Sequence, residues 1–280
     1  MELLLSAQVW RQLDVIGHKP GGSYLFVGPQ GVGKFTAAYQ LALKLCGDRR
    51  HMIVVEPAKR SIGIDQIHEL NHHLGLKAAS NHRVVIVREA GDMTLEAQNA
   101  FLKLLEEPPS DSTIILVAKE QSRLLPTILS RCQRIRFSPI SSEQVQAWLV
   151  QHQKLAQAVA AKIAQLCHGA IGLAIDLAND QGKLREQKMI ARRVQEILKD
   201  PLYQKLMLVP KLLDDYQPSI LIERMVTVLR QRLRVLANRR QPSAAKKTHR
   251  QLVACARMLR YLEANGNPKL ALDSLAMELV

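Results

Sequence analysis

The chain has 280 residues, 47% of them hydrophobic and 23% charged, with a formal net charge of +14. This length suits two or three domains, and the composition is that of a folded globular protein rather than a disordered one. No apolar run approaches the roughly 20 residues of a membrane span, and the N-terminus lacks the features of a secretory signal. We therefore expect a cytoplasmic protein with no membrane contact.

The cysteines predict neither disulfides nor a metal site. They are far apart in the sequence and form no CxxC pair: Cys46, Cys132, Cys167 and Cys255. Structural zinc sites and disulfide frameworks both need cysteines at closer or more regular spacing. We expect buried thiols and no zinc.

The positive charge is concentrated in the last third of the chain. Residues 181–280 carry 20 basic and 9 acidic side chains. Such a surplus favours an anionic partner such as nucleic acid, and is equally consistent with basic helix faces that contact acidic neighbouring subunits. The segment 238–248 predicts a loop, and its basic residues are candidates for DNA contact: Arg239, Arg240, Lys246 and Lys247.

In chain order, the first 137 residues alternate short apolar runs with longer helical periods. The strands are expected at 23–27, 52–55, 83–87, 113–117 and 133–137, with helices at 34–45, 64–74 and 94–105. This alternation predicts an α/β fold with a parallel sheet, in which the four strands with continuously apolar centres are buried on both faces. After residue 137 only helical patterns remain. Residues 138–142 predict a linker that caps the next helix, and polar turn residues at 179–182 predict a second boundary.

A phosphate-binding loop follows the first expected strand. Residues 28–34 read GPQGVGK and lead directly into a helix. The backbone N–H groups of such a loop can surround phosphate oxygens, and its lysine can reach the outer phosphates. The candidate nucleotide-binding residues are Gly28, Gly31, Gly33 and Lys34, with Phe35 and Thr36 at the two positions that follow.

Both expected Mg²⁺ ligands of a phosphate-loop ATPase are missing. Phe35 replaces the Ser or Thr after the lysine, and Thr36 should point elsewhere because one helical residue turns a side chain by about 100°. Arg88 follows the third strand where an aspartate would hold the metal, and Glu89 remains where a carboxylate could activate water. We expect no intrinsic ATP hydrolysis, while the loop leaves room for weak ATP or ADP binding without Mg²⁺.

Three further stretches narrow the possibilities: NAFLKLLEEPPS at 99–110, LLPTILSRC at 124–132 and NGNPKLALDSL at 265–275. They resemble bacterial DNA polymerase III clamp-loader subunits. The resemblance implies an α/β AAA+ module at 1–138, a small helical lid at 139–180 and an all-α collar for oligomerisation at 181–280. It also implies a role in DNA replication.

Within this family the departures from the motor pattern favour the delta-prime type over gamma or tau. Phe35 and Arg88 are two such departures, and Leu173 is a third because it stands where a nucleotide-sensing arginine is expected in the lid. The chain also lacks the family's zinc knuckle after Cys46. The resemblance implies gamma/tau and delta subunits as partners in a hetero-oligomer, which contacts the sliding clamp and primer–template DNA, with no cofactor required. The chain would then be part of the DNA-directed DNA polymerase III holoenzyme, a nucleotidyltransferase, without being an ATPase itself.

Arg131 carries the functional weight in this interpretation. It lies in the motif Ser130-Arg131-Cys132, and the resemblance implies that it acts in trans as an arginine finger on a neighbour's nucleotide. The alternative is that Arg131 caps a helix C-terminus or pairs with a surface carboxylate. Ser130 and Cys132 are expected to cap and to pack.

Two other functions remain open at the level of sequence. The chain could be a working gamma/tau-like motor ATPase whose Mg²⁺ is held by waters, Thr36 and Glu89. A more remote alternative is a zinc hydrolase, because His68, Glu69 and His72 match the H-E-x-x-H pattern. That pattern lacks a recognisable third ligand, and its helix has an apolar stripe beside the histidines.

Overall fold

The computed structural model describes residues 3–58, 60–75, 82–109, 111–199, 217–238, 241–264 and 266–279. The chain divides into two compact units, Met1–Asn179 and Asp180–Val280. Each is described by itself. No helix in the described ranges is long and apolar enough to cross a lipid bilayer.

A five-stranded parallel sheet organises the first unit, in the order β2-β3-β4-β1-β5. Its strands are β1 (Gly22–Val27), β2 (Met52–Val55), β3 (Arg83–Val87), β4 (Ser112–Ala118) and β5 (Gln133–Arg136). All five strands predicted from the sequence are therefore confirmed. The central strand β4 is buried along its whole length, as expected for a parallel sheet covered on both faces.

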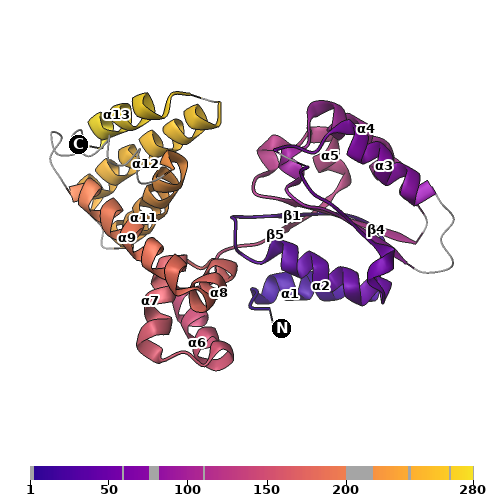
Figure 1. Cartoon of the computed structure of the whole chain (residues 1–280), viewed down its shortest axis with the longest axis horizontal. Helices are drawn as coiled ribbons and strands as arrows, with labels where there is room; N and C mark the ends of the chain where they lie inside the picture. The colour runs from indigo at the N-terminus through magenta and orange to yellow at the C-terminus, as the bar shows by residue number, and fades with distance from the viewer. Residues whose placement is uncertain are drawn as a thin grey trace. The chain divides into compact units, whose positions relative to one another are not determined.

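Helices cover both faces of the sheet. The helices α1 (Ala7–His18) and α2 (Lys34–Cys46) lie on one face, and α3 (Ile64–Gly75), α4 (Leu95–Glu106) and α5 (Pro126–Arg131) lie on the other (Figure 1). Alternation along each strand supplies both cores: Phe26 and Ile86 face α1 and α2, whereas Leu25 and Val85 face α3 and α4. The predicted α/β fold is confirmed, and α1 is a helix that the sequence analysis did not predict.

Three further helices complete the first unit: α6 (Ser142–Gln153), α7 (Gln157–Cys167) and α8 (Ile171–Asn179). The linker predicted at 138–142 ends in a capping box, in which Ser141 accepts from the Gln144 N–H and the Gln144 side chain accepts from the Ser141 N–H. The N–H of Gly172 in α8 donates to the Gly31 carbonyl at 2.7 Å. A Cβ on Gly172 would lie 3.1 Å from that oxygen, so a glycine suits this close approach.

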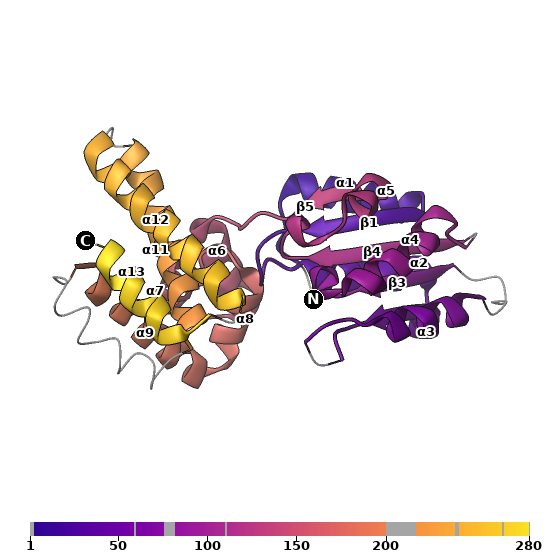
Figure 2. The same cartoon turned by 90° about the horizontal axis from the view of Figure 1, so that it is seen from above.

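The second unit is helical throughout its described residues. It contains α9 (Gln181–Lys199), α11 (Pro218–Asn238), α12 (Pro242–Glu263) and α13 (Pro268–Glu278), which are coloured orange to yellow in Figure 2. One apolar core joins the four helices, with Val194, Leu221, Leu229, Cys255 and Leu275 among its most buried members.

The loop predicted at 238–248 is wrong for most of its length. Helix α12 begins at Pro242 and contains Lys246 and Lys247, while Arg239 and Arg240 lie outside the described residues. Proline suits the first turn of a helix, where its missing N–H costs nothing, and the alanines and lysines that follow are good helix formers. The composition that indicated a loop is therefore also that of a helix start.

Candidate functional site

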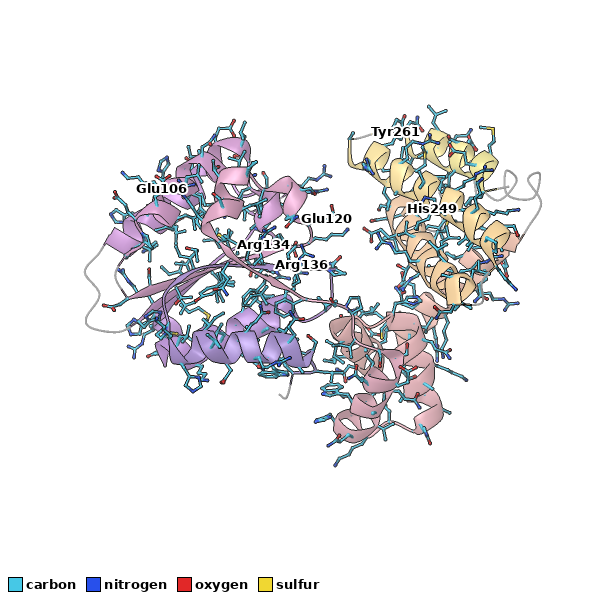
Figure 3. The ribbon with its side chains drawn as sticks, turned by 180° about the vertical axis from the view of Figure 1, so that it is seen from behind. Glu106, Glu120, Arg134, Arg136, His249 and Tyr261 are labelled. Atoms are coloured by element: carbon cyan, nitrogen blue, oxygen red, sulfur yellow. The ribbon has the colours of Figure 1, made fainter. Side chains whose placement is uncertain are left out.

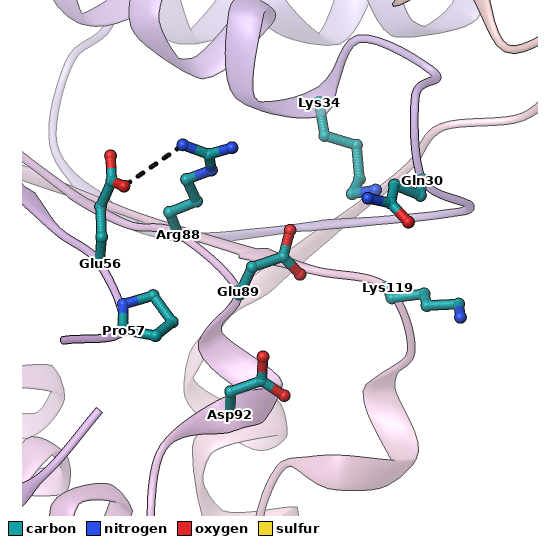
Figure 4. A pocket seen from close by; sticks show the side chains of 8 residues that line it. All are labelled: Gln30, Lys34, Glu56, Pro57, Arg88, Glu89, Asp92 and Lys119. Carbon is teal, nitrogen blue, oxygen red and sulfur yellow. Dashed lines mark hydrogen bonds and ion pairs between the residues drawn. The ribbon is translucent and has the colours of Figure 1, made fainter. Parts of the chain in front are cut away.

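A cavity of about 480 Å³ opens at the carboxyl ends of four parallel strands. Ligands of open α/β sheets bind at this edge, because the loops that leave neighbouring strands meet there. Its lining comes from the segments that follow β1, β2, β3 and β4: Gln30, Lys34, Glu56, Pro57, Arg88, Glu89, Asp92 and Lys119 (Figure 4). Three cations and three carboxylates thus face one space.

The phosphate-loop lysine is engaged by its own loop. Lys34 is 7% exposed, and its Nζ donates to the carbonyl oxygens of Gly28 and Pro29, each at 2.7 Å. Desolvation by burial lowers the pKa of Lys34, and the nearby Glu89 partly opposes this shift. The Lys34 ammonium group therefore has two hydrogen-bond acceptors within its own loop, without any bound anion.

The two residues at the metal-ligand positions contact each other. The Arg88 guanidinium lies over the Phe35 ring, 4.9 Å from its centre, and its Nη1 donates to Glu56 Oε2 at 3.3 Å. Phe35 offers no oxygen, Arg88 brings a positive charge, and Thr36 is exposed outside the cavity lining. Phe35, Arg88 and Thr36 therefore supply no oxygen ligand to this cavity for a Mg²⁺ ion, which needs oxygen ligands in near-octahedral geometry.

Glu89 lies at the end of β3 in a left-handed backbone conformation with a φ of 50°. Its carboxylate lines the cavity between Lys34 and Asp92 (Figure 4). A carboxylate at this place could accept a proton from water.

Arg131 lies at the opposite edge of the sheet from this cavity. It ends α5 and precedes β5, whose residue Gln133 pairs with Tyr24 near the start of β1. At about 3.3 Å per strand residue, the Arg131 backbone is roughly 15–20 Å from Gly28 at the end of β1. The guanidinium therefore cannot reach the phosphate loop of its own chain.

The contacts of Arg131 are those of a surface residue at a helix end. Its Nη1 donates to the Thr127 carbonyl at 3.0 Å, and its Nη2 donates to Glu106 Oε1 at 2.7 Å. Ser130 Oγ donates to the same Thr127 carbonyl, and the Cys132 thiol is buried with its pKa raised to about 11. The structure therefore shows both of the contacts that the alternative interpretation of Arg131 named, the helix-end contact and the carboxylate pair.

The H-E-x-x-H residues lie on one exposed side of α3. His68, Glu69 and His72 are all exposed, and Glu69 pairs instead with His73 at 3.8 Å. Within the described ranges, no group of three or more His, Cys, Asp or Glu side chains is arranged to hold a metal ion.

Sequence reasoning did not identify five cavity residues: Gln30, Glu56, Pro57, Asp92 and Lys119. Glu56 and Lys119 come directly after β2 and β4, so their position at strand ends was a usable signal. The sequence analysis also gave no role to Glu106, which lies within the LLEEPP stretch.

The fold is a five-stranded parallel sheet with a phosphate-type loop after β1, followed by helical segments, and solved structures share it. A RuvB variant from Thermotoga maritima aligns with a TM-score of 0.50 at 14% identity, covering 62% of this chain and 61% of that one. A DNA polymerase III gamma subunit-related protein from the same organism aligns with a TM-score of 0.55 at 21% identity, covering 97% and 98% of the two chains. At these identities the likeness concerns the fold alone.

The sequence comparisons are more specific. A family model described as DNA polymerase III, delta subunit matches residues 47–141. The DNA polymerase III subunit delta' of Bacillus subtilis is 31% identical over 150 residues, which cover 46% of each chain. That of Escherichia coli is 33% identical over 141 residues, covering 49% of this chain and 41% of the relative. The Replication factor C small subunit of Staphylothermus marinus is 34% identical over 138 residues, covering 47% and 42%.

These matches span less than half the length of the three relatives. The resemblance to bacterial DNA polymerase III clamp-loader subunits of the delta-prime type, predicted from three stretches of sequence, is confirmed.

Proposed function

We propose that this chain is a delta-prime-like subunit of a DNA polymerase III clamp loader that does not itself hydrolyse ATP. It would assemble with gamma/tau and delta subunits and help to load the sliding clamp onto primer–template DNA. The observation that carries the proposal is the contact between Phe35 and Arg88, which occupy the places of both metal ligands. The division into module (1–138), lid (139–180) and collar (181–280) belongs to the same proposal.

The charges in the cavity support the absence of hydrolysis. Phosphoryl transfer needs a bridging metal that neutralises the terminal phosphates, and an arginine cannot take its place as a ligand bridge. Lys34 is already bonded to two carbonyls, and Arg88 is paired with Glu56. Weak metal-free nucleotide binding stays compatible with this site, because the loop backbone is intact.

We further propose that Arg131 acts in trans on the nucleotide of a neighbouring subunit. Its distance from its own phosphate loop argues against a role in cis. The Arg131 side chain is 35% exposed at the surface of the first unit. A guanidinium suits this task because it is always charged and presents its donors in a fixed planar fork.

The test is a reconstituted complex that carries Arg131→Ala in this chain. We expect assembly to be normal and clamp loading to slow. The ATP hydrolysis rate of the complex should decrease by at least the contribution of one active site, compared with the wild-type complex. Trans arginines are worth about 10³–10⁵ in rate at the site they serve, and the other sites keep their own arginines. Arg131→Lys should rescue poorly because an ammonium lacks the two-donor fork.

The matched control is Arg134→Ala, which removes an exposed arginine of β5 that donates to Gln121 at 3.2 Å. This control complex should hydrolyse ATP normally. Normal hydrolysis and loading by the Arg131→Ala complex would contradict the trans role.

For the second unit we propose salt-sensitive contact with DNA through the start of α12. Lys246 and Lys247 are exposed there, and Arg239 and Arg240 stay candidates outside the described residues. Neutralising Lys246 and Lys247 together should weaken DNA binding by the complex and reduce the slope of log affinity against log salt by roughly 0.9 per lost contact. If the slope of log affinity against log salt were unchanged, Lys246 and Lys247 would not contact DNA, and their charge would serve solubility or subunit contacts instead.

A further inference from the structure

The Arg131 guanidinium lies where the ends of two helices of the first unit meet. Helix α5 ends at Arg131, and α4 ends at Glu106, whose carboxylate accepts from Arg131 Nη2 at 2.7 Å. Figure 3 labels Glu106 on the outer helical layer, together with Arg134 and Arg136 on β5. The pair therefore joins a residue of the Ser-Arg-Cys motif to one of the LLEEPP stretch.

The two nitrogens at the tip of Arg131 are held in different ways. Nη1 bonds to acceptors of its own helix, the Thr127 carbonyl at 3.0 Å and Ser130 Oγ at 3.5 Å. Nη2 bonds to a carboxylate of another helix. Contacts to α5 alone would let the long side chain turn about its terminal bonds, whereas a second partner on α4 fixes the direction of the guanidinium plane.

We infer that Glu106 is a positioning residue for Arg131. It holds the guanidinium at this end of the sheet, so that the Nε–H, for which the described residues provide no acceptor, can donate to an incoming anion. The anion is a polyphosphate carried by an adjacent subunit, so the inference rests on the proposed trans role. Fixing a donor before its anion arrives removes an ordering cost from the reaction step.

A positioning role and a structural role for Glu106 differ in their effect on stability. If Glu106 only held the fold together, its loss would lower the melting temperature. The exposed fractions of the two side chains are 35% for Arg131 and 51% for Glu106, and exposed ion pairs contribute little to folding. Loss of the Glu106 carboxylate should therefore leave thermal unfolding and assembly almost unchanged. Any loss of ATP hydrolysis should depend entirely on the presence of Arg131.

The experiment is a double-mutant cycle in the reconstituted complex, with kcat and KM for DNA-stimulated ATP hydrolysis as readouts. We expect Glu106→Ala to lower kcat by roughly two- to fivefold at the served site, the range of an exposed ion pair, with KM unchanged. Glu106→Gln should lie between wild type and Glu106→Ala, because its amide oxygen still accepts a hydrogen bond. The complex with both Glu106→Ala and Arg131→Ala should match that with Arg131→Ala alone.

Glu107→Ala is the matched control, because Glu107 caps the same helix one residue further on and should leave kcat unchanged. A normal Glu106→Ala complex, effects that add to those of Arg131→Ala, or a large fall in thermal stability would overturn the positioning role while leaving the proposed function standing. A normal Arg131→Ala complex would instead refute the trans role, and the inference about Glu106 with it.

Discussion

Gln98 is the buried polar residue on which the arrangement of α4 and α5 depends most. Its side chain is 6% exposed, and its Nε2 donates to the carbonyl oxygens of Met93 at 3.2 Å and Arg123 at 3.1 Å. Its Oε1 accepts from the N–H of Leu125, the residue that precedes α5, at 2.8 Å. One side chain thus connects α4 to the segments before and after it.

Substitution of Gln98 by alanine should destabilise the first unit by about 3 kcal/mol. Three hydrogen bonds are lost at about 1 kcal/mol each, and three backbone groups lose their partner in a mostly buried place. For a unit of this size, 1 kcal/mol shifts the melting temperature by about 2–4 °C, so we expect a decrease of roughly 6–12 °C. The melting temperature of Gln98→Met should decrease nearly as much, because methionine restores the side-chain volume but none of the hydrogen bonds.

The assay is urea or thermal unfolding followed by tryptophan fluorescence. Both tryptophans, Trp10 and Trp148, lie in the first unit, so the signal reports on that unit. Gln151→Ala is the control, an exposed glutamine of α6 whose loss should change stability by less than about 0.5 kcal/mol. A Gln98→Met variant as stable as wild type would refute the hydrogen-bond reasoning.

Four further outcomes are expected. Burial raises the pKa of Cys132 to about 11 and that of Cys255 to about 12, so at pH 8 both should react with a disulfide reagent far more slowly in the native chain than in urea. Because unfolded thiols ionise near pH 8.5, these two should also make the fold less stable as pH rises above that value, which urea titrations at pH 8 and 10 would reveal. Gly169→Ala should cost at least about 2 kcal/mol in unfolding experiments, because its φ is +83° and a Cβ would lie 2.3 Å from a backbone oxygen. Elemental analysis should find no stoichiometric zinc, whereas one zinc per chain that is lost in His68→Ala would favour a hydrolase.

The sequence predicted the sheet well because buried parallel strands are short, continuous apolar runs. The run Val84–Val87 can be read directly in this way, and it forms the buried part of β3. Helix α1 was not predicted, although Ser6 caps it and its buried residues Val9, Leu13 and Ile16 have helical spacing. Two further apolar residues, Trp10 and Val15, are exposed and obscure that stripe in the sequence.

The candidate site was predictable only as a set of positions. Motif spacing identified Lys34, Phe35 and Arg88, but spacing cannot show that an arginine from the end of β3 stacks on a ring from α2. Glu106 and Arg131 are far apart in the sequence, and only the fold of α4 against α5 brings them within 2.7 Å. Pairings of this kind depend on tertiary packing, which local patterns do not encode.

The most direct test of the account is ATP hydrolysis by the purified chain, with and without Mg²⁺, beside a Lys34→Ala control. The account predicts that the wild-type chain hydrolyses ATP no faster than Lys34→Ala under either condition, because Phe35 and Arg88 occupy the positions of the two expected metal ligands. A magnesium-dependent rate that disappears in Lys34→Ala would contradict it and would support a gamma/tau-like motor instead.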